Sequence, residues 1–242
     1  MLHKIQQFAL LSLLGACLAH ANLLTNGGFE LGAAGVQSNL TLSTDLRTEG
    51  HYVIDTNPNA YHNLWASIGG HPNNTGNMMI VNGATIPDQM VWGQSGISVS
   101  ANTFYLFSFW VASLYDANPA QFQVNINGTQ VGSNFTMTST VGQWTQNVVL
   151  WNSGTSTSAN LALFDLNLAA NGNDFALDDL SFDNPFGPPA AAAAAAAGVP
   201  EPASFALVAA ALCALHGSRR RFVRQQPVAK VGKDRSLTLA AQ

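Results

Sequence analysis

Basic residues are almost absent from the middle of this 242-residue chain. Between Asn22 and Gly198 the single lysine or arginine is Arg47, set against eleven acidic residues, which gives this stretch a formal charge of −10. A surface of that charge repels phosphate backbones, so nucleic acid is excluded as a partner. Cations, neutral sugars and high-salt surroundings remain compatible with it.

Cysteine is scarce as well. The two cysteines, Cys17 and Cys213, both lie near the ends of the chain. The middle of the chain therefore has no cysteine to form a disulfide. Its stability must come from a packed core, with or without the help of a metal.

Sequence motifs typical of catalysis are also missing. The chain has no Gly-x-Ser-x-Gly elbow, no His-Glu-x-x-His pair and no phosphate-binding glycine loop. We therefore expect a protein that is not an enzyme. A glycosidase needs only two carboxylates, and Asp55, Asp88 and Asp116 are the candidates for that alternative.

The N-terminus carries a single lysine beside an apolar run. Lys4 precedes the apolar stretch 5–19, and Ala19-His20-Ala21 fits the small-x-small cleavage pattern. We expect residues 1–21 to be a secretory signal peptide that uses the Sec export machinery, with Asn22 as the first residue of the mature chain. Cleavage before a lipidated Cys17 is the alternative.

The C-terminal segment combines three features in order. Val199-Pro200-Glu201-Pro202 comes first, the apolar run 203–215 second and Arg219-Arg220-Arg221 third. This order resembles the PEP-CTERM sorting signal of Gram-negative, exopolysaccharide-producing bacteria. The resemblance implies transient membrane insertion through the apolar helix, cleavage near Pro-Glu-Pro by an exosortase, and release or attachment at the cell surface. An amphipathic helix of the folded domain is the alternative.

These features predict five parts of the chain. They are a signal peptide (1–21), a folded domain (22–187), a Pro/Ala-rich linker (188–198), a sorting signal (199–224) and a cytoplasmic tail of unknown role (225–242). The second part is long enough for one domain with a substantial core.

Strand patterns recur at short intervals within that domain. Residues 121–126 alternate polar and apolar side chains, and the following Asn127-Gly128 favours a type I′ hairpin turn. Residues 104–111 are nearly all apolar or aromatic, which is typical of a strand covered on both faces. Further strands are expected over 144–151, 161–166 and 175–182, and no segment has a helical period. The sequence predicts an all-β antiparallel sandwich of the jelly-roll type.

A family resemblance follows these strands. Residues 22–30, Asn-Leu-Leu-Thr-Asn-Gly-Gly-Phe-Glu, are similar to the opening strand of carbohydrate-binding-module-like, galactose-binding-like jelly rolls. Residues 76–83, 103–110 and 172–182 are similar to segments that recur in secreted bacterial members. The resemblance covers most of 22–182 and implies the sandwich fold, although such folds serve many functions.

The same resemblance implies a structural calcium where the first and last strands meet. Glu30 and an Asp of the closing Asp-Asp pair are the matching positions. Strand alternation puts Asp178 on the face of Leu180 and Phe182, so we expect it to point inward, where an unpaired carboxylate is costly. Calcium is the natural partner in so acidic a domain, with Glu49 as a further candidate ligand. The alternative is that these acids cap turns and face water.

Aromatic residues outside the clearest strands are candidates for sugar binding. Tyr61, Trp65, Trp92 and Tyr115 could form a platform on which sugar rings stack. For Trp65 and Trp92, packing in the core is an equally good interpretation.

Together these observations predict an exported, surface-sorted, non-catalytic protein that associates with extracellular polysaccharide in a biofilm matrix. A structural or adhesive matrix protein that binds no sugar is the first alternative. A secreted glycoside hydrolase is the second.

Overall fold

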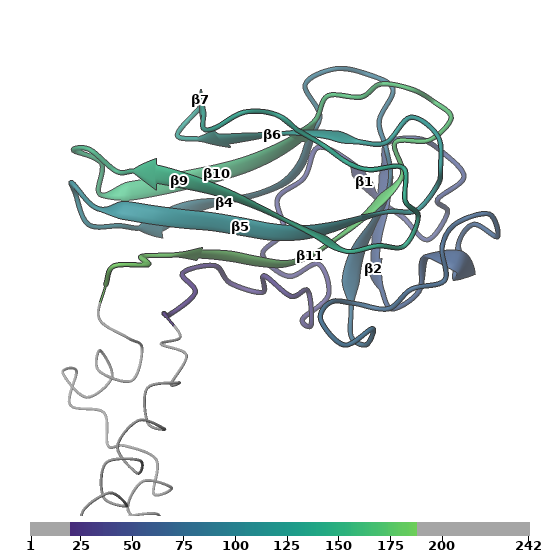
Figure 1. The fold of residues 1–242 in the computed structure, drawn as a ribbon, viewed down its shortest axis with the longest axis horizontal. Coiled ribbons are helices and arrows are strands. Elements are labelled where there is room, and N and C mark those ends of the chain that lie inside the picture. Colours follow the sequence, from purple (N-terminus) through teal and green to yellow (C-terminus); the bar gives the residue numbers. More distant parts are fainter. Residues whose placement is uncertain (1–19, 188–242) are drawn as a thin grey trace, which may run out of the picture. The chain divides into compact units, whose positions relative to one another are not determined.

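The computed structural model describes residues 20–187, which form an all-β sandwich (Figure 1). Most of the predicted signal peptide, the linker, the Pro-Glu-Pro motif, the apolar run, the arginine cluster and the tail lie outside the described residues. Within 20–187 no helix is long and apolar enough to cross a membrane. The single helical element of this part is a short 3-10 turn, η1 (Pro58–Ala60).

Two sheets make up the sandwich, and the chain alternates between them from β3 to β6 and again from β9 to β11. The six-stranded sheet contains, in spatial order, β1 (Thr41–Leu42), β2 (His51–Asp55), β3 (Met78–Asn82), β11 (Phe175–Asp183), β5 (Phe104–Ser113) and β9 (Thr145–Asn152). The five-stranded sheet contains β4 (Met90–Ser98), β10 (Ser158–Asp165), β6 (Gln121–Ile126) and β7 (Thr129–Gln130), with β8 (Phe135–Thr136) also on β6. All pairs are antiparallel except the short β1–β2 pair. The predicted antiparallel jelly roll is confirmed.

The strand β6 shows how the sequence pattern produces the two layers. Phe122, Val124 and Ile126 are buried between the sheets, while the intervening polar residues are half-buried on the outside. At the end of β6, Asn127 and Gly128 have φ values of 53° and 77°, as a type I′ turn requires, and β7 pairs back onto β6. The predicted hairpin is confirmed.

The core between the sheets is rich in aromatic rings. Phe122 meets Phe175 edge to face with ring centroids 4.8 Å apart, an arrangement that adds to the stabilisation from apolar burial. On the opposite face of the six-stranded sheet a second, smaller cluster is buried beneath loops; its members are Leu46, Val53, Trp65, Met78, Ile80, Leu114 and Ala176. Most of β5 is therefore covered on both faces as predicted, although Phe104 at its start is 45% exposed.

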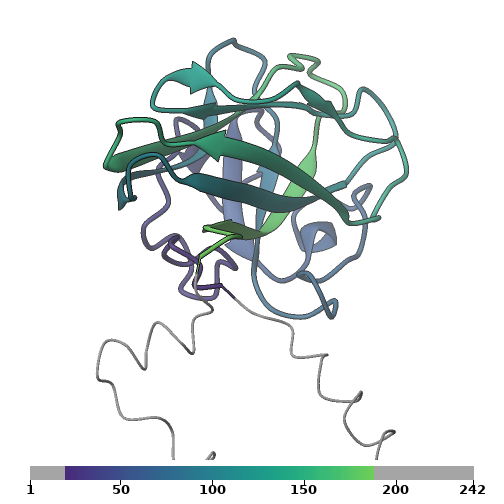
Figure 2. The same cartoon turned by 60° about the vertical axis from the view of Figure 1, so that its left-hand side comes forward.

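The start of the described chain is bonded to its last strand. The Asn22 side chain accepts from Phe182 N (3.0 Å) and donates to Leu180 O (2.9 Å), and Leu180 N donates to Gly27 O (2.9 Å). A side chain at Gly27 would collide with Leu180 O, so glycine is needed for this close approach. Figure 2 shows both ends of the described part at one edge of the sandwich, where a His20 ring nitrogen lies 3.1 Å from Gly187 O.

Candidate functional site

Asp178 is buried as predicted, but on the other face of its strand. Phe175 and Leu177 point into the main core, and the β11–β5 register shifts between Asp178 and Ser181, with Asp179 in the left-handed region at φ 45°. This irregularity returns Leu180 to the core side. Asp178 therefore shares a face with Ala176, beneath the loop 69–77, and the predicted grouping with Leu180 and Phe182 is wrong because a regular period of two was assumed.

The loop 69–77 supplies hydrogen bonds to this carboxylate. Asp178 Oδ2 accepts from His71 N (2.9 Å), and Oδ1 accepts from Asp179 N (2.7 Å). Burial, together with the negative charges of Asp179 and Glu30, raises the pKa of Asp178 to about 7, and the two hydrogen bonds oppose this shift without cancelling it. The His71 ring in turn lies 2.7 Å from Asp179 Oδ2 and stacks on Trp110 at 3.8 Å.

Backbone oxygens converge beside Asp178 at a position that only glycine leaves open. A Cβ on Gly70 would lie 2.7 Å from Thr75 O, 2.9 Å from Asp178 Oδ2 and 3.1 Å from Asn77 O. The exposed Glu30 joins the same loop, since its Oε1 accepts from Asn77 N (3.1 Å). The fold thus brings together the two predicted metal ligands, Glu30 and Asp178.

This donor set suits a hard cation. Carboxylate and carbonyl oxygens are the ligands that Ca²⁺ takes, and two of the donors are backbone atoms. Within residues 20–187 no three His, Cys, Asp or Glu side chains group as metal ligands, so an ion here would depend on the carbonyls of Thr75 and Asn77. Glu49 lies elsewhere, in a hollow with Asp174, and the expectation that it assists Glu30 is not supported.

The predicted aromatic platform is wrong for both tryptophans. Trp92 is 2% exposed and stacks on Phe107 in the core, because β4 pairs it with Leu163, whose side chain is also buried there. Trp65 is 4% exposed and donates from Nε1 to Asp174 Oδ2 (3.1 Å). Tyr61 is half-buried, and its hydroxyl donates to Asp55, but it also lines an open hollow in the surface.

The three carboxyls proposed for a hydrolase come from separate elements. Asp55 ends β2 and is bonded to Tyr61; Asp88 lies in the β3–β4 loop and Asp116 in the β5–β6 loop. Asp165 is buried and Asp174 half-buried, and desolvation raises the pKa of Asp165 to about 6 and that of Asp174 to about 7. Neither was singled out from the sequence.

The outer face of the five-stranded sheet is a site that the sequence interpretation missed. A hollow of about 120 Å³ is lined by Asp88, Gln123, Asn125, Phe164 and Leu166. Gln123 pairs with Phe164 across β6 and β10, and its Nε2 donates to Asn125 Oδ1 (2.9 Å). We call Gln123, Asn125 and Phe164 the outer amide face. The alternating amides of 121–126 were its visible signal in the sequence.

Small residues lie beside this face. Ala162 stands opposite Asn125 on one side and Gly93 on the other, and Met90 stands opposite Phe164. The residues in line with Asn125 across these strands are thus small, and the Met90 side chain lies over Gly93.

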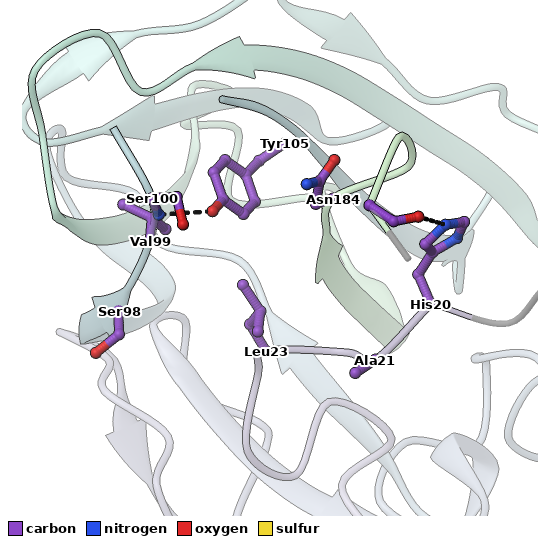
Figure 3. A pocket seen from close by; sticks show the side chains of 9 residues that line it. His20, Ala21, Leu23, Ser98, Val99, Ser100, Tyr105 and Asn184 are labelled. Atoms are coloured by element: carbon purple, nitrogen blue, oxygen red, sulfur yellow. Dashed lines mark hydrogen bonds between the residues drawn. The ribbon is translucent and has the colours of Figure 1, made fainter. Parts of the chain in front are cut away.

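A larger hollow of about 360 Å³ lies at the edge where the chain ends meet (Figure 3). Leu23, Val99 and Tyr105 line it, and the Tyr105 hydroxyl accepts from Ser100 N (2.8 Å). Its other walls include His20 and Ala21, which cleavage before Asn22 would remove. We therefore do not assign function to it.

Comparison with known proteins gives the following picture. No family model matches the chain, and no curated protein matches it. Solved structures similar to it include a sugar-binding protein, the EclA C-terminal domain (17% identity, 39% of this chain and 66% of that chain, TM-score 0.35). They also include the CBM22-1 xylan-binding domain of Paenibacillus barcinonensis Xyn10C, with 17% identity over 69% of this chain and 97% of that chain and a TM-score of 0.46. A third is TmCBM61 in complex with beta-1,4-galactotriose, with 13% identity over 68% of this chain and 99% of that chain and a TM-score of 0.44.

These similarities are low in identity and in TM-score. The chain spans about two thirds of the EclA chain and about half (48%) of the tandem CBM22-1–CBM22-2 structure. A ligand for this protein must therefore be argued from its own residues.

Asp178 makes stability depend on pH in a defined direction. Its pKa is about 7 in the folded protein against an ordinary 3.8, so above pH 4 the unfolded chain loses a proton that the folded chain keeps. In chelator, we expect this group to lower the free energy of unfolding by about 1.4 kcal/mol per pH unit between pH 4 and 7. Denaturant unfolding should show a shallower slope in Asp178→Asn than in the unchanged protein, because Asp165 and Asp174, whose pKa values burial also raises, contribute the rest of the slope in both.

Asp116→Asn, at an exposed carboxyl, is the matched control and should follow the unchanged protein. Parallel stability profiles for the unchanged protein and Asp178→Asn would contradict the burial of an uncompensated carboxyl.

Proposed function

We propose that this chain is an exported, non-catalytic protein that binds extracellular polysaccharide through the outer amide face. The observation that carries the proposal is the hollow in which Gln123, Asn125 and Phe164 meet on the outside of the five-stranded sheet. Two primary amides side by side can donate to and accept from adjacent sugar hydroxyls. A half-buried aromatic ring beside them offers an apolar surface to the C–H face of a sugar.

The charge of the site favours a neutral ligand. Asp88 is the single ionisable residue in this hollow, and a carboxylate readily accepts from sugar hydroxyls. In such a site a few polar groups fix the orientation of the ligand, and the aromatic ring supplies contact area. Because the face is open, affinity for a polymer would come from several sugar units along the strands.

The two ends of the chain support export. The signal-peptide pattern at 1–21 and the Pro200-Glu201-Pro202 motif with its apolar run and arginines are the sequence observations on which this rests. Recognition by the Sec machinery and by an exosortase would deliver residues 22–187 to the cell surface or the medium. A binding domain for matrix polysaccharide fits that location.

A matrix protein that contacts other proteins is the second candidate. Leu150 is 50% and Val148 41% exposed on β9, and Leu150 pairs with Leu106 on β5. With Phe104 they place apolar side chains together on the outside of the six-stranded sheet, where a partner surface could cover them.

We further propose a structural Ca²⁺ beside Asp178. The glycine-lined convergence of Thr75 O, Asn77 O and the Asp178 carboxylate, with Glu30 on the same loop, is the observation that supports it. The ion would neutralise a buried carboxylate and tie the loop 69–77 to the last strand. Its contribution is to folding, not to the sugar site.

The sugar-binding proposal predicts that Phe164→Ala and Gln123→Ala each weaken binding of neutral polysaccharide. Loss of the ring or of one amide should reduce affinity roughly tenfold, the equivalent of about 1.4 kcal/mol. A glycan array followed by titration calorimetry on the full chain measures this. Leu150→Ala, on the other sheet, should bind normally; equal binding by all three variants, or a blank array, would exclude the outer amide face.

The calcium proposal predicts that chelation lowers the melting temperature of the full chain at pH 7.5. Asp178→Ala should melt lower and lose the response to both chelator and added Ca²⁺, because the buried ligand is gone. Asp116→Ala serves as the control that keeps the response. If the unchanged protein gives the same melting curve with and without chelator, the proposal of a bound Ca²⁺ is excluded.

Export predicts the mass of the processed protein. Intact mass spectrometry of membrane and extracellular fractions from the native host should find a species that begins at Asn22 and ends near Pro200-Glu201-Pro202. A species retaining its complete C-terminus in the membrane would show instead that the protein is anchored and that the sorting assignment is wrong.

A further inference from the structure

Two hollows that share lining residues lie among the loops over the six-stranded sheet, and we call them the two halves of a groove. Its inner half, about 250 Å³, is lined by Glu49, Trp65 and Asp174 among others; its outer half, about 590 Å³, is lined by Asn59, Ala60, Tyr61 and Asn63. Arg47 and His62 line both halves, so they stand where the two join. We call the outer half, with Arg47 and His62, the Arg47 groove.

The Arg47 guanidinium has no partner in the part of the chain that the structure describes. The one ion pair between residues 20 and 187 joins His71 to Asp179, and no hydrogen bond from the Arg47 side chain is formed there. This is the single arginine or lysine among eleven acids between Asn22 and Gly198. Within residues 20–187 the fold therefore does not use this charge, and there all five N–H donors remain free for a ligand.

The backbone beneath Arg47 is nevertheless held in place. Arg47 N donates to Asp45 Oδ1 (3.1 Å), and the neighbouring Leu46 is 1% exposed. Leu46 O accepts from the buried Asn82 Nδ2 (2.9 Å). A cationic side chain on an anchored segment loses less freedom on binding than one on a loose loop.

Acidic residues are kept out of the outer half. Glu49 and Asp174 line only the inner half, and burial raises the pKa of Asp174 to about 7. Asp55 lies behind Tyr61, whose hydroxyl it binds, and burial with this bond raises the pKa of Tyr61 to about 12. The outer half thus presents one permanent positive charge, two amides and a neutral phenol. The exposed Asp45 carboxylate lies two residues before Arg47 and accepts from its backbone N–H, while charges beyond about 8 Å, the Debye length in physiological salt, are weakened by screening.

We propose that the Arg47 groove binds the carboxylate of a uronate residue in an acidic polysaccharide. The guanidinium matches a carboxylate with two parallel hydrogen bonds. Asn63 and His62 line the same hollow and offer polar groups for neighbouring hydroxyls. The Tyr61 ring offers the apolar contact. This second site is separate from the outer amide face and does not depend on it.

The test compares charged and neutral forms of the same sugar. The full chain is titrated by calorimetry with trigalacturonate and with its methyl ester, which keeps the rings and removes the charge. We expect the ester to bind at least tenfold more weakly. Arg47→Gln should lower the affinity for trigalacturonate by at least tenfold and leave binding of the ester unaffected. Arg47→Lys should lower the affinity for trigalacturonate less, because lysine keeps the charge although it cannot form the two parallel hydrogen bonds.

Two controls keep the result specific. Phe164→Ala should bind trigalacturonate normally, so failure of the neutral-sugar site and failure of this one are distinguishable. Arg47 is exposed, and Arg47→Gln should melt like the unchanged protein, which excludes unfolding as the cause of any loss. Equal binding of acid and ester, equal binding by Arg47→Gln, or no binding of trigalacturonate would overturn the proposal.

Two small competitors, free galacturonate and acetate, distinguish a polymer from a simple carboxylate as the ligand. If neither competes with trigalacturonate for the site, a polysaccharide ligand is supported. Equal competition by free galacturonate and by acetate would keep a carboxylate site but overturn its assignment to a polymer.

Discussion

The burial of a carboxylate at the bulge in β11 is the constraint around which this end of the sandwich is arranged. Asp178 lies almost fully out of solvent in a part of the chain where arginine and lysine are reduced to Arg47. An isolated charge there would cost several kcal/mol, and the loop 69–77 offsets part of this cost by donating the His71 N–H to the carboxylate. The same loop binds Glu30, and through it the N-terminal segment is joined to the last strand. A protonated carboxyl at low pH and a bound cation at neutral pH are two ways to meet one electrostatic requirement.

The two outer faces of the sandwich have different chemistry because the sheets are covered differently. Part of the six-stranded sheet lies beneath loops that bury a second apolar cluster. The five-stranded sheet exposes polar side chains of β6 and β10. Loops over one sheet create a walled groove with a charged group, whereas the strands of the other create a surface of amides.

Basic residues are scarce in residues 22–187, so a single positive charge matters more to the electrostatics of this part of the chain than it would on an ordinary surface. An arginine on an ordinary surface is one of many and is often paired with an acid at little net gain. Here Arg47 is the sole guanidinium of residues 22–187, and it is left unpaired despite the surrounding acids. Arg47 is exposed and solvated, whereas Asp178 is buried, and that difference explains why the first can serve a ligand and the second must be satisfied by the fold.

Local sequence patterns predicted the sandwich, most of its strands and the Asn127-Gly128 hairpin, whereas a calcium site at Glu30 and Asp178 was expected only from the family resemblance. Alternation, turn residues and aromatic runs are local signals, and local signals suffice for strands. The tertiary structure alone decided which face each side chain occupies after the β11 bulge, and it buried Trp65 and Trp92. It also brought β6 and β10 together as the outer amide face and placed Arg47 beside Tyr61 and His62. These outcomes depend on register and on contacts between distant segments, and no local pattern encodes a one-residue shift that moves a side chain to the opposite face.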